Sequence, residues 1–285
     1  MPNDAHLVTA RLTALAQAWR VTVEASVETE RSVIAYGWRG TDAVVLKVVK
    51  AETSDEWRSG EVTAAFAGRA FVRALEQTGG AVLLERIRPG RDLVDLARGG
   101  RDDEATAILA DVVAAMAPND APSWCGSVAD WGRGFAWYAT TDDRQISGDL
   151  VARAAAEHEA LSATQRATRL LHGDLQHSNV LEDRERGWLA VDPKGVVGEV
   201  ECEMAALLRN PSESPAVFAD PARVERRVAV LSSRLGLDTH RILRWTFALG
   251  VLSAIWQVED GQVVDPVGGP LALVRVVQAI LGHRS

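Results

Sequence analysis

Cysteine is scarce in this sequence, and its scarcity excludes two kinds of protein. Only Cys125 and Cys202 occur among 285 residues, far apart and without a CxxC or a Cys/His cluster. Neither a disulfide framework nor a zinc site is therefore indicated. Two isolated thiols fit a reducing compartment, so we predict a cytoplasmic protein.

Long apolar runs and repeats are also missing. The longest apolar run, from Trp245 to Trp256, is shorter than the roughly 20 residues that a membrane-spanning helix needs. The N-terminal MPNDAHLVTARL lacks the basic start and the apolar core of a signal peptide. We expect no membrane role.

Basic charge is in deficit. There are 31 Lys and Arg against 39 Asp and Glu, for a net charge of −8 and a pI of about 5.3. This balance argues against a general nucleic-acid binder and is compatible with a cationic small substrate. The 47% hydrophobic and 25% charged residues are ordinary for a globular protein with a buried core.

The N-terminal part of the chain predicts an antiparallel sheet. A helix is expected at 4–19, with Asp4 as a candidate N-cap. Five strand-like runs follow, at 20–27, 32–38, 43–50, 70–76 and 81–87. A second helix from Ser54 to Gly68 lies between the third and fourth strands.

Lys47 interrupts the third predicted strand, where a buried ammonium group needs an anion or a carboxylate. Glu61, in the following helix, could face the sheet and pair with Lys47. Protein kinases use such a pair to aim a lysine at the ATP phosphates. The alternative is that Lys47 extends to solvent from an edge strand and Glu61 is a solvated helix charge.

Pro89 and Gly90 break the pattern of strands, and we place a domain boundary there. It separates an N-terminal nucleotide-binding lobe, residues 1–87, from a C-terminal catalytic and substrate lobe, residues 88–285. The segment 85–88 is a candidate hinge, in which the backbone of Glu85 and Ile87 could bind an adenine edge.

After the boundary the pattern is mostly helical. Helices are expected at 92–98, 102–117, 127–139, 147–168, 199–209, 220–235, 238–257 and 269–282, and two strands at 178–183 and 188–192. A small antiparallel sheet followed by a larger helical part is the layout of the kinase-like fold.

The run LLHGDLQHSNVL, Leu170 to Leu181, carries Asp174 and Asn179 five residues apart. Phosphoryl transfer needs a carboxylate that orients a hydroxyl and an amide oxygen that holds Mg²⁺, and a short loop can supply both. Asp192, at the end of a strand-like run, could be a second Mg²⁺ ligand. The alternative is a polar turn, since Gly, Asp, Ser and Asn are common in turns.

These residues resemble a known family. The Asp174 loop and the run WLAVDPKGVVGEVECEMAALLRNP (Trp188 to Pro211) are similar to the streptomycin 6-phosphotransferase group of aminoglycoside and hydroxyurea resistance kinases. The order of Lys47, Glu61, the hinge, Asp174, Asn179 and Asp192 also matches. The resemblance implies an α+β fold of the protein-kinase-like, two-lobed aminoglycoside phosphotransferase type.

The resemblance implies ATP- and Mg²⁺-dependent phosphorylation of a hydroxyl group on a small molecule, with an aminoglycoside such as streptomycin as the first candidate. Asp174 would be the catalytic carboxylate, Asn179 and Asp192 would hold Mg²⁺, and Lys47 with Glu61 would position ATP. Another acceptor, such as hydroxyurea, a sugar or a metabolite, and a non-catalytic ATP-binding module are the alternatives. We expect a monomer without nucleic-acid or membrane partners.

Three charged residues near Asp192 allow two interpretations each. Lys194 could reach phosphate oxygens or be a solvent-exposed charge. Glu199 and Glu203 could bind a cationic substrate, or they could stabilise the start of a helix, which we favour. Glu203 stands where the family more often has an aspartate that holds the catalytic loop.

A second departure lies in the nucleotide loop. The stretch 27–37 lacks GxGxxG and offers only Ser32 and Gly37. Phosphate contacts by backbone amides therefore cannot be assigned from it.

Overall fold

The computed structural model describes residues 2–116, 118 and 120–283. The chain divides into two compact units. Unit 1 comprises Met1–Arg91, Ala115–Ser123 and Leu181–Gly195, and unit 2 comprises Asp92–Ala114, Trp124–Val180 and Val196–Ser285.

Unit 1 is built on a five-stranded antiparallel sheet, as predicted. Its strands are β1 (Thr22–Glu28), β2 (Ser32–Arg39), β3 (Asp42–Val49), β4 (Ala74–Thr78) and β5 (Ala81–Glu85). Their order is β1-β2-β3-β5-β4, so β3 is the central strand. The helix α1 (Pro2–Ala18) packs on this sheet, with Val8 and Ala16 in a buried cluster that includes Leu46 of β3.

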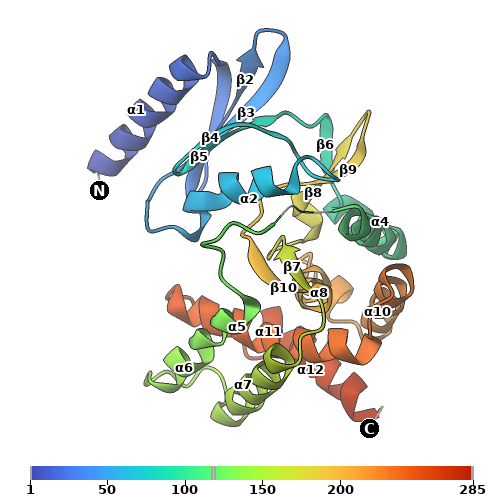
Figure 1. The fold of residues 1–285 in the computed structure, drawn as a ribbon. Coiled ribbons are helices and arrows are strands. Elements are labelled where there is room, and N and C mark those ends of the chain that lie inside the picture. Colours follow the sequence, from blue (N-terminus) through green and yellow to red (C-terminus); the bar gives the residue numbers. More distant parts are fainter. Residues whose placement is uncertain (1, 117, 119, 284–285) are drawn as a thin grey trace. The chain divides into compact units, whose positions relative to one another are not determined.

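The segment between β3 and β4 is helical, but it is not one helix. Ser54 caps a 3₁₀ turn, η1 (Asp55–Arg58), by accepting a hydrogen bond from the Glu56 N–H, and α2 (Ser59–Phe66) follows. Ala67 and Gly68 both have positive φ, so α2 ends there. Figure 1 shows α2 in cyan beside the sheet, where it packs on β4 and β5.

The segment 181–195 folds with unit 1, although the predicted boundary at residue 88 assigns it to the second lobe. It contributes β8 (Val180–Asp183) and β9 (Gly187–Ala190) to a three-stranded sheet of order β6-β8-β9, in which β6 is Pro89–Asp92. Phe71 pairs with Ala190. Arg186 donates to the carbonyls of Gly68 and Phe71, which ties the β8–β9 turn to the chain that leads into β4.

Unit 2 is mostly helical. Its helices are α3 (Val94–Arg98), α4 (Asp102–Ala115), α5 (Val128–Trp131), α6 (Arg133–Ala139), α7 (Gly148–Ala163), η2 (His177–Asn179), α8 (Val200–Leu208), α9 (Pro215–Phe218), α10 (Pro221–Leu235), α11 (Thr239–Glu259) and α12 (Gly269–His283). The helix α11 is the central element, because it packs against α6, α7, α8, α10 and α12. Figure 1 shows α12 and α7 beside it.

The boundaries of these helices follow local chemistry. Asp220 and Asp238 each accept a backbone N–H three residues on, which confirms them as N-caps of α10 and α11. The predicted helix at 127–139 is two short helices, α5 and α6, on either side of Gly132. The predicted helix at 147–168 ends at Ala163, and β7 (Thr168–Leu171) follows and pairs with β10 (Val196–Glu199).

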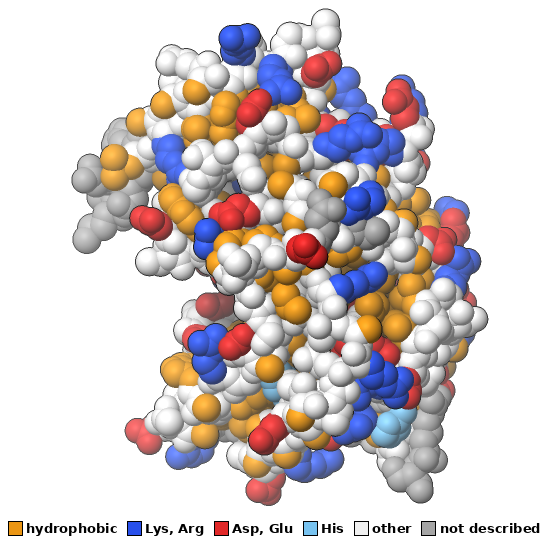
Figure 2. Space-filling view, viewed as in Figure 1, with side chains coloured by type: hydrophobic (Ala, Val, Ile, Leu, Met, Phe, Trp, Pro, Cys, Tyr) orange, Lys and Arg blue, Asp and Glu red, His pale blue; other side chains and the backbone are white. Residues whose placement is uncertain are grey.

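Charged side chains of both signs mix over the face shown in Figure 2, so the net negative charge does not gather into one acidic field there. Among the described residues, no helix is long and apolar enough to cross a membrane.

Candidate active site

Lys47 lies at the centre of the sheet in unit 1. It pairs in register with Ile34 of β2 on one side and Val82 of β5 on the other. The residue is only 7% exposed. Lys47 therefore does not extend from an edge strand, and its buried ammonium group requires partners.

Glu56, and not Glu61, is the helical partner of Lys47. The Lys47 Nζ lies 2.7 Å from Glu56 Oε2, whereas Glu61 pairs with Arg58 at 2.8 Å in an (i, i+3) contact. The predicted pairing of Lys47 with Glu61 is wrong. The reason is the 3₁₀ turn, because its tighter pitch turns Glu56 toward the sheet before α2 begins.

Trp57 anchors this turn. Its ring packs on the β4–β5 turn, where a Cβ at Gly80 would lie 2.3 Å from the ring, and its carbonyl accepts the Gly80 N–H at 2.8 Å. Gly80 has a φ of +66°, so glycine suits the turn on both counts. The Arg11 guanidinium of α1 also lies over the Trp57 ring, 4.5 Å from the ring centre.

Asp192 is the second partner of Lys47. Its Oδ1 lies 2.5 Å from Lys47 Nζ, and its backbone has a φ of +59°, a left-handed conformation in which Asp is one of the few tolerated residues. Gly195, three residues on, packs so closely on Val62 of α2 that a Cβ would lie 2.6 Å from that side chain. The DPKG run is thus fitted to unit 1 at both ends.

The two carboxylates set the protonation of Lys47. Burial alone lowers the pKa of Lys47, but the charges of Asp192 and Glu56 and their hydrogen bonds outweigh it, so the pKa lies above its usual range. The ammonium group is therefore charged at neutral pH.

Lys194 matches the exposed-charge interpretation. Its Nζ lies 3.6 Å from Asp55, and both side chains are about half exposed. An ion pair of this kind contributes little to stability.

The candidate hinge follows β5. The Glu85 carboxylate accepts the Arg73 N–H at 2.8 Å and also binds Arg186, so this side chain holds unit 1 together. The Arg86 N–H donates to the Ala43 carbonyl. Within the described ranges, the Ile87 N–H donates to no backbone carbonyl, which is compatible with a hinge amide that binds a ligand.

Asp174 lies in unit 2, on a loop whose backbone amides are bound by a buried carboxylate. Gly173 has a φ of +81°, which places Asp174 in a tight turn after β7. Glu203 accepts the Gly173 N–H at 3.1 Å and the Leu175 N–H at 3.4 Å. Burial raises the pKa of Glu203, and His172 and these backbone donors oppose the rise.

Glu203 is therefore a support for the loop and is only 3% exposed. The resemblance implied this role for an aspartate at this position, and the glutamate here fills it. The same burial contradicts the candidate role of Glu203 in binding a cationic substrate, because a carboxylate already engaged by loop amides does not face a ligand.

Asn179 closes the loop around Asp174. Its Nδ2 donates to the Asp174 carbonyl at 2.9 Å, so its side-chain oxygen is the atom left for a cation. The Asp174 N–H donates to His172 Nδ1 at 3.3 Å. His172 thus braces the loop rather than facing a reacting group.

Arg209 is a site residue that the sequence did not reveal. At the end of α8, its Nη2 lies 3.4 Å from Asp174 Oδ1, and both side chains are about four-fifths buried. Burial lowers the pKa of Arg209, and Asp174 opposes this shift. An arginine at the end of a helix carries no motif, so only the packing of α8 under the loop identifies it.

Glu199 does not face a ligand. It is 1% exposed, and its carboxylate binds Arg241 and the Trp245 indole N–H of α11 and accepts the Arg166 N–H. The candidate role of Glu199 in binding a cationic substrate is contradicted, because these buried donors already engage its oxygens. The carboxylate fastens α11 to the start of α8.

A cavity of about 340 Å³ borders the Asp174 loop in unit 2. Gln176, His177 and Ser178 of the loop form one side of it. Its charged lining consists of three carboxylates and one guanidinium group, from Asp92, Asp95, Glu213 and Arg98. The cavity is therefore suited to a polar, cationic group.

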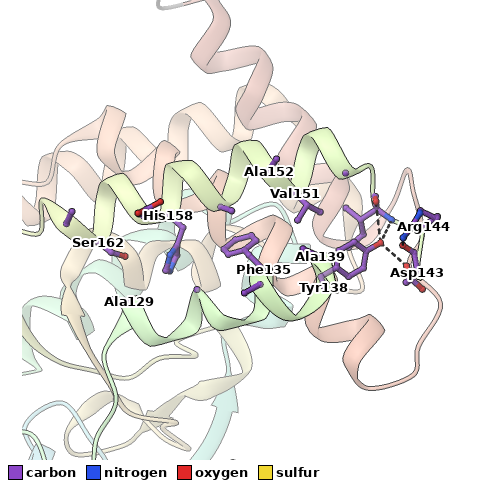
Figure 3. Close-up of a pocket in the computed structure, with 17 residues that line it drawn as sticks. Ala129, Phe135, Tyr138, Ala139, Asp143, Arg144, Val151, Ala152, His158 and Ser162 are labelled. Atoms are coloured by element: carbon purple, nitrogen blue, oxygen red, sulfur yellow. Dashed lines mark hydrogen bonds between the residues drawn. The ribbon is translucent and has the colours of Figure 1, made fainter. Parts of the chain in front are cut away.

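A larger cavity, of about 920 Å³, lies between α6 and α7 (Figure 3). Phe135 and His158 point into the space between the helices, and alanines form much of the rest of its wall. At one end, Tyr138 donates to Asp143 at 2.8 Å. None of the predicted site residues lines this cavity.

Residues 18–261 match the family model described as aminoglycoside/hydroxyurea antibiotic resistance kinase. The chain belongs to this family. It is 35% identical over 199 residues to the streptomycin 3''-kinase of Klebsiella pneumoniae, covering 68% of this chain and 73% of that protein.

Two further relatives of this kinase cover more of the chain. The hydroxyurea phosphotransferase of Kitasatospora aureofaciens is 32% identical over 266 residues, covering 86% of this chain and 73% of that protein. The streptomycin 6-kinase of Streptomyces glaucescens is 30% identical over 284 residues, covering 94% and 88%.

Solved structures confirm the kinase-like fold. An apo aminoglycoside phosphotransferase APH(4)-Ia matches with a TM-score of 0.65 at 20% identity, covering 95% of this chain and 99% of that one. The choline kinase LicA of Streptococcus pneumoniae matches with a TM-score of 0.62 at 15% identity, covering 97% and 99%. At these identities the likeness establishes the fold alone.

Proposed function

We propose that this kinase transfers the γ-phosphoryl group of ATP to a hydroxyl group of a small cationic molecule, with an aminoglycoside such as streptomycin as the first candidate. The observation that carries this proposal is the ordered Asp174 loop. Its carboxylate, its Asn179 amide and its buried Glu203 support occur in a chain that belongs to a kinase family.

The nucleotide contacts are assigned to unit 1. Lys47 binds phosphate oxygens through its charged ammonium group, and Glu56 positions it. The Ile87 N–H and the Glu85 carbonyl bind the edge of the base, since the Glu85 N–H already donates to the Arg73 carbonyl. Glu61 and Lys194 have no part in this assignment, because each is paired at the surface.

The chemistry is assigned to the loop of unit 2. The Asp174 carboxylate orients the acceptor hydroxyl and accepts its proton as the oxygen attacks phosphorus. Arg209 holds that carboxylate in one orientation.

Mg²⁺ is the expected companion of ATP. Asp192 and Asn179 are the oxygen donors we assign to it, since carboxylate and amide oxygens suit this hard cation. Bound there, it would neutralise charge on the transferred phosphoryl group.

The acidic cavity beside the loop supports a cationic acceptor. Asp92, Asp95 and Glu213 outnumber the single Arg98, and Gln176 to Ser178, which follow Asp174 directly, form its wall. A guanidinium or ammonium group seated there would be attracted by the excess carboxylates.

The test is a comparison of two acceptors. Purified protein, labelled ATP and Mg²⁺ are incubated with streptomycin or with hydroxyurea, and the variants Asp95→Asn and Glu213→Gln are assayed alongside. We expect each variant to raise the KM for the cationic streptomycin about 2- to 5-fold, the scale of a partly exposed ion pair, and to leave the KM for the neutral hydroxyurea unchanged.

Asp103→Asn is the control. Asp103 is an exposed acid that pairs with Arg226 outside the cavity, so its loss removes the same charge without touching the site. Equal changes of the KM for streptomycin in all three variants would show that the cavity is not part of the acceptor site. Phosphorylation of hydroxyurea but not of streptomycin would establish the second candidate, which the 32% identity to a hydroxyurea phosphotransferase favours. Mg-dependent nucleotide binding without transfer to any acceptor would instead indicate a regulatory module.

A further inference from the structure

Two carboxylates share one ammonium group in unit 1. The Lys47 Nζ lies 2.5 Å from Asp192 Oδ1 and 2.7 Å from Glu56 Oε2. The two contacts differ in exposure, because the Glu56 side chain is 18% exposed and that of Asp192 is 48% exposed. Lys47 is thus held by one partner that is largely buried and one that faces water.

The contact with Lys47 occupies Asp192 Oδ1, one of the two carboxylate oxygens with which Asp192 could bind a metal ion. A divalent cation binds a carboxylate oxygen at 2.0–2.6 Å, the distance range at which the Lys47 ammonium already lies. Two cations at one oxygen repel each other. Lys47 and a metal ion are therefore competitors for Asp192 Oδ1.

The contact with Glu56 is the more durable of the two. A buried ion pair is costly to break, because each separated charge stays in a poorly solvated place, whereas an exposed carboxylate regains water on release. The anchoring of η1 by Ser54 and Trp57 also fixes Glu56. Lys47 is expected to give up Asp192 first.

We propose that Lys47 masks Asp192 in the nucleotide-free protein and leaves it for phosphate oxygens when a nucleotide binds, while Glu56 retains the lysine. Metal binding at Asp192 is then coupled to nucleotide binding. Glu56 is the positioning residue of this exchange. The inference rests on the proposed function for the role of Asp192 as a metal ligand.

The first test measures binding of Mn²⁺ alone to the full chain without nucleotide, by electron paramagnetic resonance of the free ion. We expect Lys47→Met to bind Mn²⁺ about tenfold more tightly than the parent protein, the scale of one charge-assisted hydrogen bond. The double variant Lys47→Met/Asp192→Asn should lose this gain.

Lys50→Met is the matched control. Lys50 follows β3 and pairs with Glu28 at 2.6 Å, so its loss removes the same charge from unit 1 without exposing Asp192. Three results would each overturn the proposal. The Mn²⁺ affinity could be unchanged in Lys47→Met, it could rise equally in Lys50→Met, or its rise could persist in the double variant.

A second measurement covers the case in which Lys47→Met does not fold. In the presence of a chelator, Asp192→Asn should bind ADP several-fold more tightly than the parent protein, because Lys47 no longer has to leave a carboxylate. Glu76→Gln, which removes an exposed acid of unit 1 paired with Arg39, should leave the ADP affinity unchanged. Equal ADP affinities of Asp192→Asn and the parent protein would contradict masking.

Neither measurement needs an acceptor. Suppose that Lys47→Met binds Mn²⁺ no more tightly and Asp192→Asn binds ADP no more tightly, while the parent protein still phosphorylates its acceptor. That result would overturn the masking of Asp192 and leave the proposed function in place. If both variants show the tighter binding but the parent protein phosphorylates no acceptor, the proposed function is overturned and the masking of Asp192 stands.

Discussion

At the scale of single residues, Asp174 is a largely buried carboxylate that must keep one orientation. Arg209 at 3.4 Å and the loop amides bound to Glu203 keep it in place. A carboxylate so arranged can accept a proton from a hydroxyl group, and an amide of the same shape cannot.

We therefore predict that Asp174→Asn lowers kcat at least ~100-fold, the scale of a lost general base. The affinity for ATP should change little, because the nucleotide contacts are assigned to unit 1. Steady-state kinetics and nucleotide titration check the two parts. A variant with unchanged kcat would remove Asp174 from the mechanism.

Single residues also show where a pattern misleads. Lys47, Asp174 and Asn179 were selected by residue type and spacing, and the structure places each in an ordered setting. Glu61 satisfied the same pattern and pairs elsewhere, because a 3₁₀ turn that no spacing rule anticipates shifts Glu56 into its place.

At the scale of elements, η1 and α2 offer two glutamates five residues apart, and the geometry favours the one on η1. We predict that Glu56→Gln raises the KM for ATP about tenfold, because Lys47 loses a charge-assisted partner. The KM for ATP of Glu61→Gln should stay near that of the parent protein. A larger rise of the KM in Glu61→Gln than in Glu56→Gln would instead support the pairing of Lys47 with Glu61 that the sequence predicted.

The short helix η2 carries a histidine that makes the loop sensitive to acid. His177 is fully buried, and burial together with the charge of Arg227 lowers its pKa to about 3. In the unfolded chain its pKa is near 6.5. Between these values the unfolded state binds more protons than the folded state.

The contribution of His177 to stability is therefore fully present above pH 6.5 and is lost as the pH falls toward 3, at up to about 1.4 kcal/mol per pH unit. Urea unfolding at pH 7 and pH 5 checks this. His177→Gln should flatten the dependence, whereas His240→Gln, at an exposed position, should not. Parallel slopes for all three proteins would contradict the assignment.

At the scale of the whole molecule, buried polar pairs join elements that are distant in sequence. Arg227 of α10 is fully buried, bonds Asp102 at the start of α4 and reaches His177 of η2 at 3.4 Å. The same two helices also carry an exposed pair, Arg234 with Asp111. Two ion pairs between one pair of helices thus differ chiefly in burial.

We predict that Asp102→Asn lowers the free energy of unfolding by about 3–5 kcal/mol, because it leaves Arg227 as an unpaired buried charge. Asp111→Asn should cost less than ~1 kcal/mol. Chemical denaturation of the two variants measures the difference. Similar losses would show that burial does not govern these pairs.

The sequence by itself determined the five-stranded antiparallel sheet, most helices of the second half and the kinase family, because periodicity, caps and short motifs are local and survive without a partner. Only the tertiary structure decided that Glu56 pairs with Lys47, that Arg209 reaches Asp174, that Glu199 and Glu203 are internal supports, and that the segment 181–195 folds with unit 1. Each of these depends on which residues meet across long stretches of chain. Burial and charge at such meetings are set by packing, which no local pattern records.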